Sequence, residues 1–380
     1  MLPASQVSRR LRAVSLLVAT ALLVVFNAAR PAQAATESVR MVIGLLLPPE
    51  EAEGASLRAG VTLAVEQANQ GPSPKVTLVT RGRTGQWGAD AVEAARMVLD
   101  DGAQGLIAPP NGAATHLALQ VAGRTAVPVI SLCADSSVSK TGVPWMVRIA
   151  PGTIEEGRFL LSGLTVDQAD SIEWVALVPD GRAGREVSLD LNRAATAAHR
   201  QLKRVCEVSS TLTNLESVTA QVLKEQPKGV LVWLDPAPAG RLTRSLREAG
   251  FVGRLAGPSR CNSPAFLSAS AQASEGFLVP AIVLDKLGEQ HFLSFQTAFR
   301  QRYGIQAGVT AAEGYDAARL LVHLLGKYDS QSLPRAFPLV FSLPGVSGEL
   351  SFDAEGNRKL ALRLLVARRG SFVAVEPAQK

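Results

Sequence analysis

From residue 41 onward the chain alternates short apolar runs with stretches whose apolar residues recur at helical spacing. Met41–Leu47 indicates a buried strand that two prolines end, and residues 55–69 place apolar side chains on one helical face. The cycle repeats over residues 76–131 and again over residues 172–249. Strands that alternate with helices of this length predict right-handed βαβ units around parallel sheets. The expected fold class is therefore α/β.

Two such series predict two Rossmann-like lobes. The first series has strands at 41–47, 76–80, 105–108 and 127–131 and helices at 55–69, 89–100 and 112–125. The second has strands at 172–178, 205–212 and 230–234 and helices at 185–203, 215–225 and 239–249. Two further helices are expected at 292–303 and 311–327, and β-structure at 348–352 and 361–367.

Two extended segments, Trp145–Pro151 and Phe277–Leu284, are expected to cross between the lobes. The predicted N-lobe comprises residues 39–150 and 281–336, and the predicted C-lobe comprises residues 151–280 and 337–380. A chain that crosses more than once favours a hinge, and a cleft between two open sheets is where such folds bind ligands.

The first 34 residues have the pattern of an export signal. Three arginines precede an uncharged apolar run at residues 13–26, and small residues flank the expected cut after Ala34. The apolar run is shorter than the roughly 20 residues that span a bilayer. No cysteine stands near the cut, so we expect a periplasmic protein without a lipid anchor.

The charge of the exported chain excludes some partners. The full sequence has 39 basic and 33 acidic residues, a net charge of +6. Residues 1–34 contain four arginines and no acidic residue, so the rest has 35 basic and 33 acidic residues, a net charge of +2. This near balance gives no reason to expect nucleic acid or an anionic membrane as a partner.

Signatures of enzymes and metal sites are scarce. The histidines lie in helical stretches without a carboxylate or cysteine at ligand spacing; they are His116, His199, His291 and His323. No G-x-S-x-G turn occurs, and the glycine-rich loop Gly82–Gly88 lacks the Lys-Ser/Thr pair of a phosphate-binding loop. We therefore expect no catalytic residue, no metal site and no cofactor.

Two loops at the carboxyl ends of predicted strands suit ligand binding. Asn111 is a plausible N-cap, and the backbone N–H groups from Gly112 onward would face the edge of the sheet, where a carboxylate could bind. The loop at 131–137 follows the next strand and contains Cys133 and Asp135 among small polar residues. Helix capping alone remains the alternative role of both segments.

In these segments the chain resembles the type I periplasmic solute-binding proteins, most of all the branched-chain amino-acid binding proteins of ABC transporters. The resemblance spans residues 41 to about 375. Six motifs carry it in the family's order: Ile43–Pro48, Gly60–Asn69, Val127–Ser131, Glu275–Val279, Gly314–Ala317 and Gly348–Gly356. The resemblance implies a monomer with two lobes and a hinge, which delivers a small-molecule ligand to an ABC permease in the inner membrane.

The residues that hold an amino acid in that family are replaced in this chain. Gly112 stands where a serine holds the ligand carboxylate, and Asp135 where a threonine touches the ligand. Ser259 replaces the glutamate that pairs with the ligand ammonium, and Glu53 replaces a tyrosine. Removing one member of a buried ion pair costs about 3–5 kcal/mol. Asp135 could supply a carboxylate from the opposite lobe, and the N–H groups of Gly112 and Cys133 could still bind one.

A simple aliphatic amino acid is therefore not the expected ligand. Four arginines in loops expected near the cleft favour an anionic or carboxylate-bearing small molecule: Arg81, Arg83, Arg182 and Arg260. Loss of ligand binding is one alternative. A periplasmic regulator or sensor on the same fold, such as a peptidoglycan-synthase activator, is another, although such activators usually carry the lipid anchor that is not expected here.

The cysteine count leaves the redox state open. Cys133, Cys206 and Cys261 allow one disulfide and a free thiol, or three free thiols. On the positions that the resemblance implies, Cys133 and Cys261 fall on ligand loops of opposite lobes, and a disulfide between them would lock the cleft shut.

Overall fold

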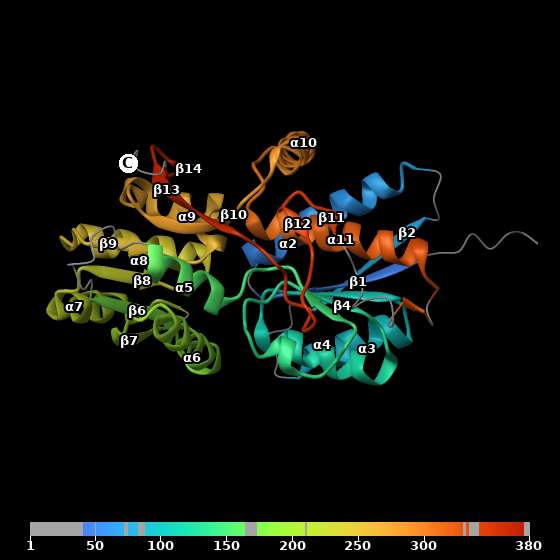
Figure 1. Ribbon diagram of the computed structural model, residues 1–380, viewed down its shortest axis with the longest axis horizontal. Coiled ribbons are helices and arrows are strands. Elements are labelled where there is room, and N and C mark those ends of the chain that lie inside the picture. The colour runs from blue at the N-terminus through green and yellow to red at the C-terminus, as the bar shows by residue number, and fades with distance from the viewer. Residues whose placement is uncertain are drawn as a thin grey trace, which may run out of the picture. The chain divides into compact units, whose positions relative to one another are not determined.

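The computed structural model describes residues 41–49, 51–71, 75–82, 88–163, 173–209, 211–329, 332–333 and 342–375. The expected export signal at residues 1–34 and the loop residue Arg83 lie outside this part of the chain. Within it, no helix combines the length and the apolar character needed to cross a lipid bilayer. The described residues from Met41 onward form two lobes, each built around its own sheet (Figure 1).

The first lobe contains a five-stranded sheet in the order β2-β1-β3-β4-β5, in which all neighbours are parallel. Its strands are β1 (Met41–Leu47), β2 (Val76–Gly82), β3 (Gly105–Ala108), β4 (Val129–Ser131) and β5 (Met146–Arg148). Its helices are α2 (Glu51–Ala68), α3 (Ala89–Leu99), α4 (Gly112–Thr125), α10 (Lys286–Tyr303), α11 (Val309–Lys327) and the 3₁₀ turn η1 (Val138–Lys140).

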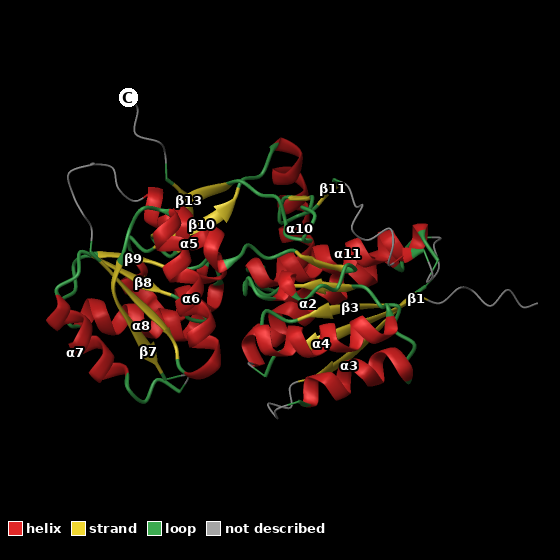
Figure 2. Ribbon diagram, turned by 60° about the horizontal axis from the view of Figure 1, so that its bottom comes forward, coloured by secondary structure: helices red, strands yellow, loops and turns green. Residues whose placement is uncertain are grey.

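Strand β1 is buried along its whole length because helices cover both faces of the first sheet (Figure 2). Successive side chains of a strand point to opposite faces. Ile43 and Leu45 pack in the core that includes α2 and α11, whereas Leu46 packs in the core that includes α3 and α4. Each fully buried side chain of this size contributes about 1.5–3 kcal/mol relative to exposure, so β1 anchors both cores of the lobe.

The second lobe contains a seven-stranded sheet in the order β14-β13-β10-β9-β8-β6-β7. Its strands are β6 (Trp174–Pro179), β7 (Leu202–Val208), β8 (Gly229–Val232), β9 (Arg254–Ala256), β10 (Leu278–Ile282), β13 (Leu362–Arg368) and β14 (Ser371–Ala374). Its helices are α5 (Thr153–Gly163), α6 (Gly181–Ala197), α7 (Leu215–Glu225), α8 (Pro236–Glu248), α9 (Pro264–Ser270), η2 (Ser259–Cys261) and η3 (Ala271–Ser274). Neighbouring strands are parallel in the part of the sheet formed by β7, β6, β8, β9 and β10. Strands β13 and β14 continue the sheet with antiparallel pairs.

Within the described residues, three segments join the lobes. The chain leaves the first lobe through residues 149–152, returns through residues 283–285, and crosses again through residues 351–361. The short antiparallel strands β11 (Leu343–Pro344) and β12 (Glu349–Leu350) precede the last crossing, and Val346 and Leu350 pack in the core of α11. A bridge between Arg148 and Asn357 places the first and third segments side by side. The multi-crossover hinge expected from the sequence is confirmed.

Several helices and strands have other bounds in the structure than the sequence predicted. The crossing segment Trp145–Pro151 contains β5, and Phe277–Leu284 contains β10, an interior strand of the second sheet. The helix expected at 185–203 ends at Ala197, and His199 adopts a left-handed conformation with φ of 53°. Strand β7 lies at the edge of its sheet and buries only two residues. The polar residues at its start therefore have the sequence pattern of an exposed helix end, which is why the helix was expected to continue to residue 203.

Candidate functional site

The residues expected to bind a ligand lie where the carboxyl ends of the two sheets face each other. In the first lobe they follow three neighbouring strands: Glu53 follows β1, Asn111 and Gly112 follow β3, and Cys133 and Asp135 follow β4. In the second lobe, Ser259 and Arg260 form η2 after β9. The carboxyl ends of parallel strands meet at one edge of a sheet, which brings these loops together.

The start of α4 already faces carboxylates of the protein. Asn111 caps the helix, since its side-chain oxygen accepts a hydrogen bond of 2.9 Å from the backbone N–H of Ala114. A Cβ atom on Gly112 would lie 2.8 Å from Oδ2 of Asp135 and 3.3 Å from Oε2 of Glu186, which belongs to α6 of the second lobe. Two negative charges at this helix start disfavour a ligand carboxylate there, because like charges repel.

Replacing Asn111 by alanine is expected to lower the free energy of unfolding by about 1 kcal/mol, because α4 loses its N-cap. Urea unfolding of the wild type and the variant measures this difference. The exposed residue Gln120 on the same helix offers a control, since Gln120→Ala removes no cap. If Asn111→Ala leaves stability unchanged but weakens ligand binding, the side chain acts on the ligand instead of capping the helix.

Asp135 is a fixed negative charge beside Gly112. Burial opposes its ionisation, but the His116 imidazole, whose Nε2 lies 3.7 Å from Oδ2, and hydrogen bonds from Ser137 lower the pKa of Asp135 to about 2. Its Oδ2 atom is buried and accepts no hydrogen bond from any described residue. The carboxylate therefore remains ionised, with one buried oxygen that bonds to no described group.

Cys133 lies two residues before Asp135 and is buried in the core that includes α3 and α4. Its sulfur accepts a hydrogen bond of 3.3 Å from the backbone N–H of Asp135. Burial raises the pKa of the Cys133 thiol to about 12, and the charges of Asp135 and Arg260 both act on it. Cys133, Cys206 and Cys261 are all free and buried, so the structure contains three separate thiols. A neutral buried thiol is a poor nucleophile.

Arg260 is the cation that the second lobe places against the first. Its Nη1 atom lies 3.7 Å from Oε1 of Glu53 on α2 and 3.4 Å from Oδ1 of Asp235, the residue before α8. The side chain is only 18% exposed. Burial by itself lowers the pKa of Arg260, but the surrounding carboxylates, Glu53 first, raise it overall. Both contacts are longer than a good charge-assisted hydrogen bond, so the guanidinium can accept a closer anionic partner.

The other arginines expected near the cleft have different environments. Arg81 lies on β2, where its guanidinium bonds to Asp101 at 2.7 Å and to Glu93 at 3.4 Å. Arg182 is 64% exposed and pairs with Glu186 at 2.8 Å. Arg83 lies outside the described residues. The prediction that all four arginines lie in loops near the cleft is therefore wrong for Arg81. This residue lies on β2, and its ion pairs tie the strand to Glu93 of α3 and to Asp101.

Two buried carboxyl groups beside Arg260 were missed by the sequence analysis. Glu156 on α5 is 2% exposed and accepts a hydrogen bond of 3.2 Å from the backbone N–H of Ser259. Glu313 on α11 is 5% exposed. Burial raises the pKa of Glu156 to about 7 and that of Glu313 to about 8. A single acidic residue on the otherwise apolar first turns of α11 was a signal in the sequence that could have identified Glu313.

These raised pKa values predict that stability falls as the pH rises from about 4.5 to about 8. In the unfolded chain a glutamate ionises near pH 4.5, whereas folded Glu313 stays protonated until about pH 8. The stabilisation from the neutral form is complete below pH 4.5 and is lost as the pH rises through 8. We expect Glu313→Gln to gain stability over the wild type between pH 5 and 8.5, on the order of 3 kcal/mol. Urea unfolding at several pH values measures the difference. The same dependence of unfolding free energy on pH in the variant and the wild type would contradict the prediction.

A hydrogen-bonded link also joins the lobes beside Asp135. The backbone N–H and the hydroxyl of Ser136 donate to the carboxylate of Asp190 on α6, at 3.1 Å and 2.8 Å. Both residues are buried, and Arg193 contacts the same carboxylate at 3.1 Å. The lobes are therefore held together at this edge of the cleft by the protein's own groups.

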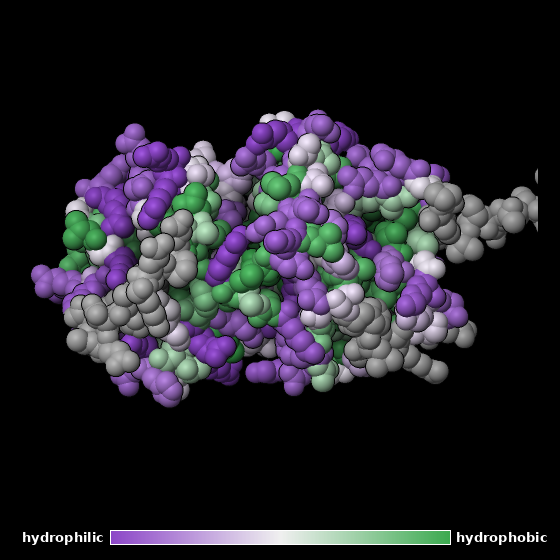
Figure 3. Space-filling model, turned by 45° about the horizontal axis from the view of Figure 1, so that its top comes forward, coloured by the Kyte–Doolittle hydropathy of each residue, from purple (hydrophilic) through white to green (hydrophobic). Residues whose placement is uncertain are grey.

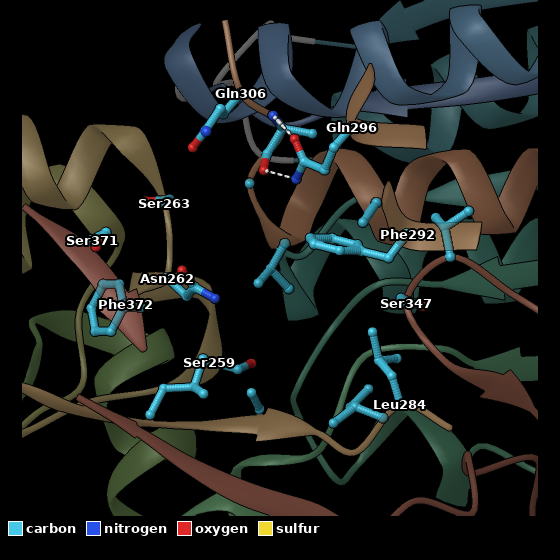
Figure 4. Close-up of a pocket in the computed structure, with 18 of the residues that line it drawn as sticks. Ser259, Asn262, Ser263, Leu284, Phe292, Gln296, Gln306, Ser347, Ser371 and Phe372 are labelled. Carbon is cyan, nitrogen blue, oxygen red and sulfur yellow. Dashed lines mark hydrogen bonds between the residues drawn. The ribbon is translucent and has the colours of Figure 1, made fainter. Parts of the chain in front are cut away.

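Two cavities lie between the lobes on either side of the loop that begins α9. The larger has a volume of about 940 Å³ and includes Ser259 and Glu313 in its wall (Figure 4). The smaller, of about 540 Å³, includes Glu53 and Asp235. They share wall residues, namely Ser263, Pro264, Gln306, Gly308 and Val309. Because Arg260 interacts with Glu53, Asp235 and Glu313, its guanidinium lies near the walls of both cavities. Volumes of this size suit small molecules.

The comparison with known proteins agrees with this architecture. A family model described as "Periplasmic binding protein" matches residues 43–357. The substrate-binding protein LivJ of a branched-chain amino-acid transporter from Streptococcus pneumoniae, in complex with isoleucine, is 16% identical with a TM-score of 0.78, covering 88% of this chain and 98% of that chain. The leucine-binding protein LivK from Thermotoga maritima is 18% identical with a TM-score of 0.77, at the same coverage.

A solute-binding protein of an ABC transporter from R. palustris, in complex with benzoate, is 18% identical with a TM-score of 0.79, covering 88% of this chain and 95% of that chain. No curated protein matches this sequence. The family match covers most of the chain, and TM-scores of 0.77 to 0.79 show that the chain shares the fold of these solved structures. The chain therefore belongs to the periplasmic binding protein family and has the type I fold of the branched-chain amino-acid binding proteins.

Proposed function

We propose that this protein is the periplasmic solute-binding subunit of an ABC importer and that its ligand carries a carboxylate. The observation that supports the ligand class is the position of Arg260. It brings a guanidinium whose side chain is only 18% exposed from the second lobe to within 4 Å of Glu53 in the first lobe. A guanidinium matches the geometry of a carboxylate, with two parallel hydrogen bonds.

The charges around the cleft oppose the usual orientation of an amino acid. Asp135 and Glu186 flank Gly112 at the start of α4, where the family resemblance places the ligand carboxylate. Ser259 offers no charge to an ammonium group. The carboxylates beside Gly112 and the guanidinium at η2 favour a ligand whose carboxylate points to Arg260, with hydrogen-bond donors toward Asp135.

Binding between the lobes supplies a mechanism for transport without chemical conversion of the ligand. A ligand that touches both lobes binds the closed form more tightly than the open form and shifts the population toward it. The three crossing segments form the hinge, and a permease that distinguishes the two forms would accept the loaded protein. We propose that the protein does this as a monomer.

Thermal-shift measurements on the purified protein test the proposal. We expect stabilisation by members of a panel of organic acids and little by isoleucine or leucine. A large stabilisation by leucine with none by any organic acid would contradict the proposed ligand class. Native mass spectrometry of freshly purified protein would detect a retained ligand, and the intact mass would test cleavage after Ala34.

A further inference from the structure

The larger cavity has features of a binding site that the ion pairs of Arg260 do not use. Both lobes form its wall: α10 and α11 come from the first lobe, and β10, β13 and β14 come from the second. Figure 3 shows apolar surface gathered between these two sides of the molecule. Any molecule in this cavity would contact both lobes.

One side of the cavity is apolar. Figure 4 shows Phe292 projecting from α10 into the cavity, with Leu284 below it and Phe372 of β14 on the opposite side. Phe292 is only partly covered by the first core. Removing apolar surface from water is favourable by about 25 cal/mol per Å², so this wall would stabilise an aromatic or branched group.

Arg363 gives the same cavity an unused hydrogen-bond donor. It lies on β13 opposite Ala281 of β10, and both residues line the cavity. Its Nε atom is buried and meets no acceptor among the described residues. A buried donor without an acceptor costs about 1–3 kcal/mol, more when charged, which a bound anion would recover.

The remaining charges of the wall leave room for an anion. Its charged residues are Glu289, Arg300, Glu313 and Arg363. Because the pKa of Glu313 is raised to about 8, this residue is mostly protonated at neutral pH. Besides this carboxyl group, the wall carries two arginines and Glu289. Glu313 makes no hydrogen bond to a described residue, and a neutral carboxyl group can donate one to an anion.

We infer that the larger cavity is a binding site of its own for apolar monocarboxylates, with Arg363 holding the carboxylate and Phe292 packing against the apolar body. The class comprises acids with one aromatic or branched apolar group. The inference goes beyond the proposed function because it assigns the anion to a different arginine, which lines the larger cavity as Arg260 does not.

Titration calorimetry with phenylacetate as the probe tests this site in the full-length exported protein. We expect phenylacetate to bind at least about tenfold more tightly than phenylacetamide, which lacks the charge, and than acetate, which lacks the apolar body. Arg363→Gln and Phe292→Ala should each weaken phenylacetate binding about tenfold or more. Arg368→Gln, on the same strand, and Leu287→Ala, on the same helix, change exposed residues outside the cavity and should have no effect.

The variant Arg260→Gln separates this inference from the proposed function. Loss of phenylacetate binding in Arg363→Gln but not in Arg260→Gln supports the cavity site, and the role of Arg260 is then tested by the acid that the thermal-shift panel selects. The reverse result overturns the cavity site and leaves the proposed function standing. Unchanged phenylacetate affinity in Arg363→Gln overturns the cavity site, whatever the result for Arg260→Gln. Thermal unfolding of each variant verifies that it is folded.

Discussion

Replacing Asp316 by alanine is expected to lower the free energy of unfolding by about 3–5 kcal/mol. Its carboxylate is fully buried on α11 and accepts hydrogen bonds from the backbone N–H groups of Val346 and Ser347, both at 2.8 Å. The Ser347 hydroxyl donates a third at 2.6 Å, and the buried Arg358 guanidinium lies nearby. Without Asp316, these donors and the charge of Arg358 would lose their partner inside the protein.

Urea unfolding of Asp316→Ala and the wild type measures this loss. Asp316→Asn keeps the shape but not the charge and should fall between the two. His323 is exposed on the same helix, so His323→Ala is a control that should change stability little. A loss below about 1 kcal/mol for Asp316→Ala would show that the turn at residues 345–348 does not depend on this carboxylate. Because that turn precedes the third crossing segment, the result also tests how firmly the hinge is held.

Replacing Arg260 by glutamine is expected to weaken binding of the carboxylate that the thermal-shift panel selects by about 100-fold. The physical reason is the loss of a mostly covered cation that would bond to the ligand carboxylate more closely than it contacts Glu53 and Asp235. Arg260→Lys keeps the charge but not the paired donors, so an intermediate affinity is expected. Titration calorimetry measures the three affinities.

Arg182→Gln is the matched control for this prediction. Arg182 also lies near the cleft, but its guanidinium is mostly exposed and already paired with Glu186. We expect its removal to change affinity little, because exposed ion pairs contribute about 0–1 kcal/mol. An affinity within about twofold of the wild type for Arg260→Gln would remove the basis of the proposed ligand class.

Part of the fold was predictable because burial leaves a clear local pattern. Strands β1 and β3 and helices α4 and α7 have the bounds expected from the sequence. β1 is a continuous apolar run covered on both faces, and α4 begins at a capping asparagine. The short elements β9 and α9 were missed, because three and seven residues carry too little periodicity to be recognised.

Part of the candidate site was also predictable from the sequence, and part was not. By itself, the sequence determined that Gly112 and Asp135 follow predicted strands, because strand ends and helix starts leave local patterns, whereas the structure shows that the strands before Glu53, Gly112 and Asp135 are neighbours. Only the tertiary structure decided which charges meet: Arg81 pairs with Asp101, and Arg260 reaches across to Glu53. The tertiary structure also places Glu313 in a buried position near Arg260. Such pairs join residues far apart in the chain, and their strength depends on distance and burial, which no local pattern contains.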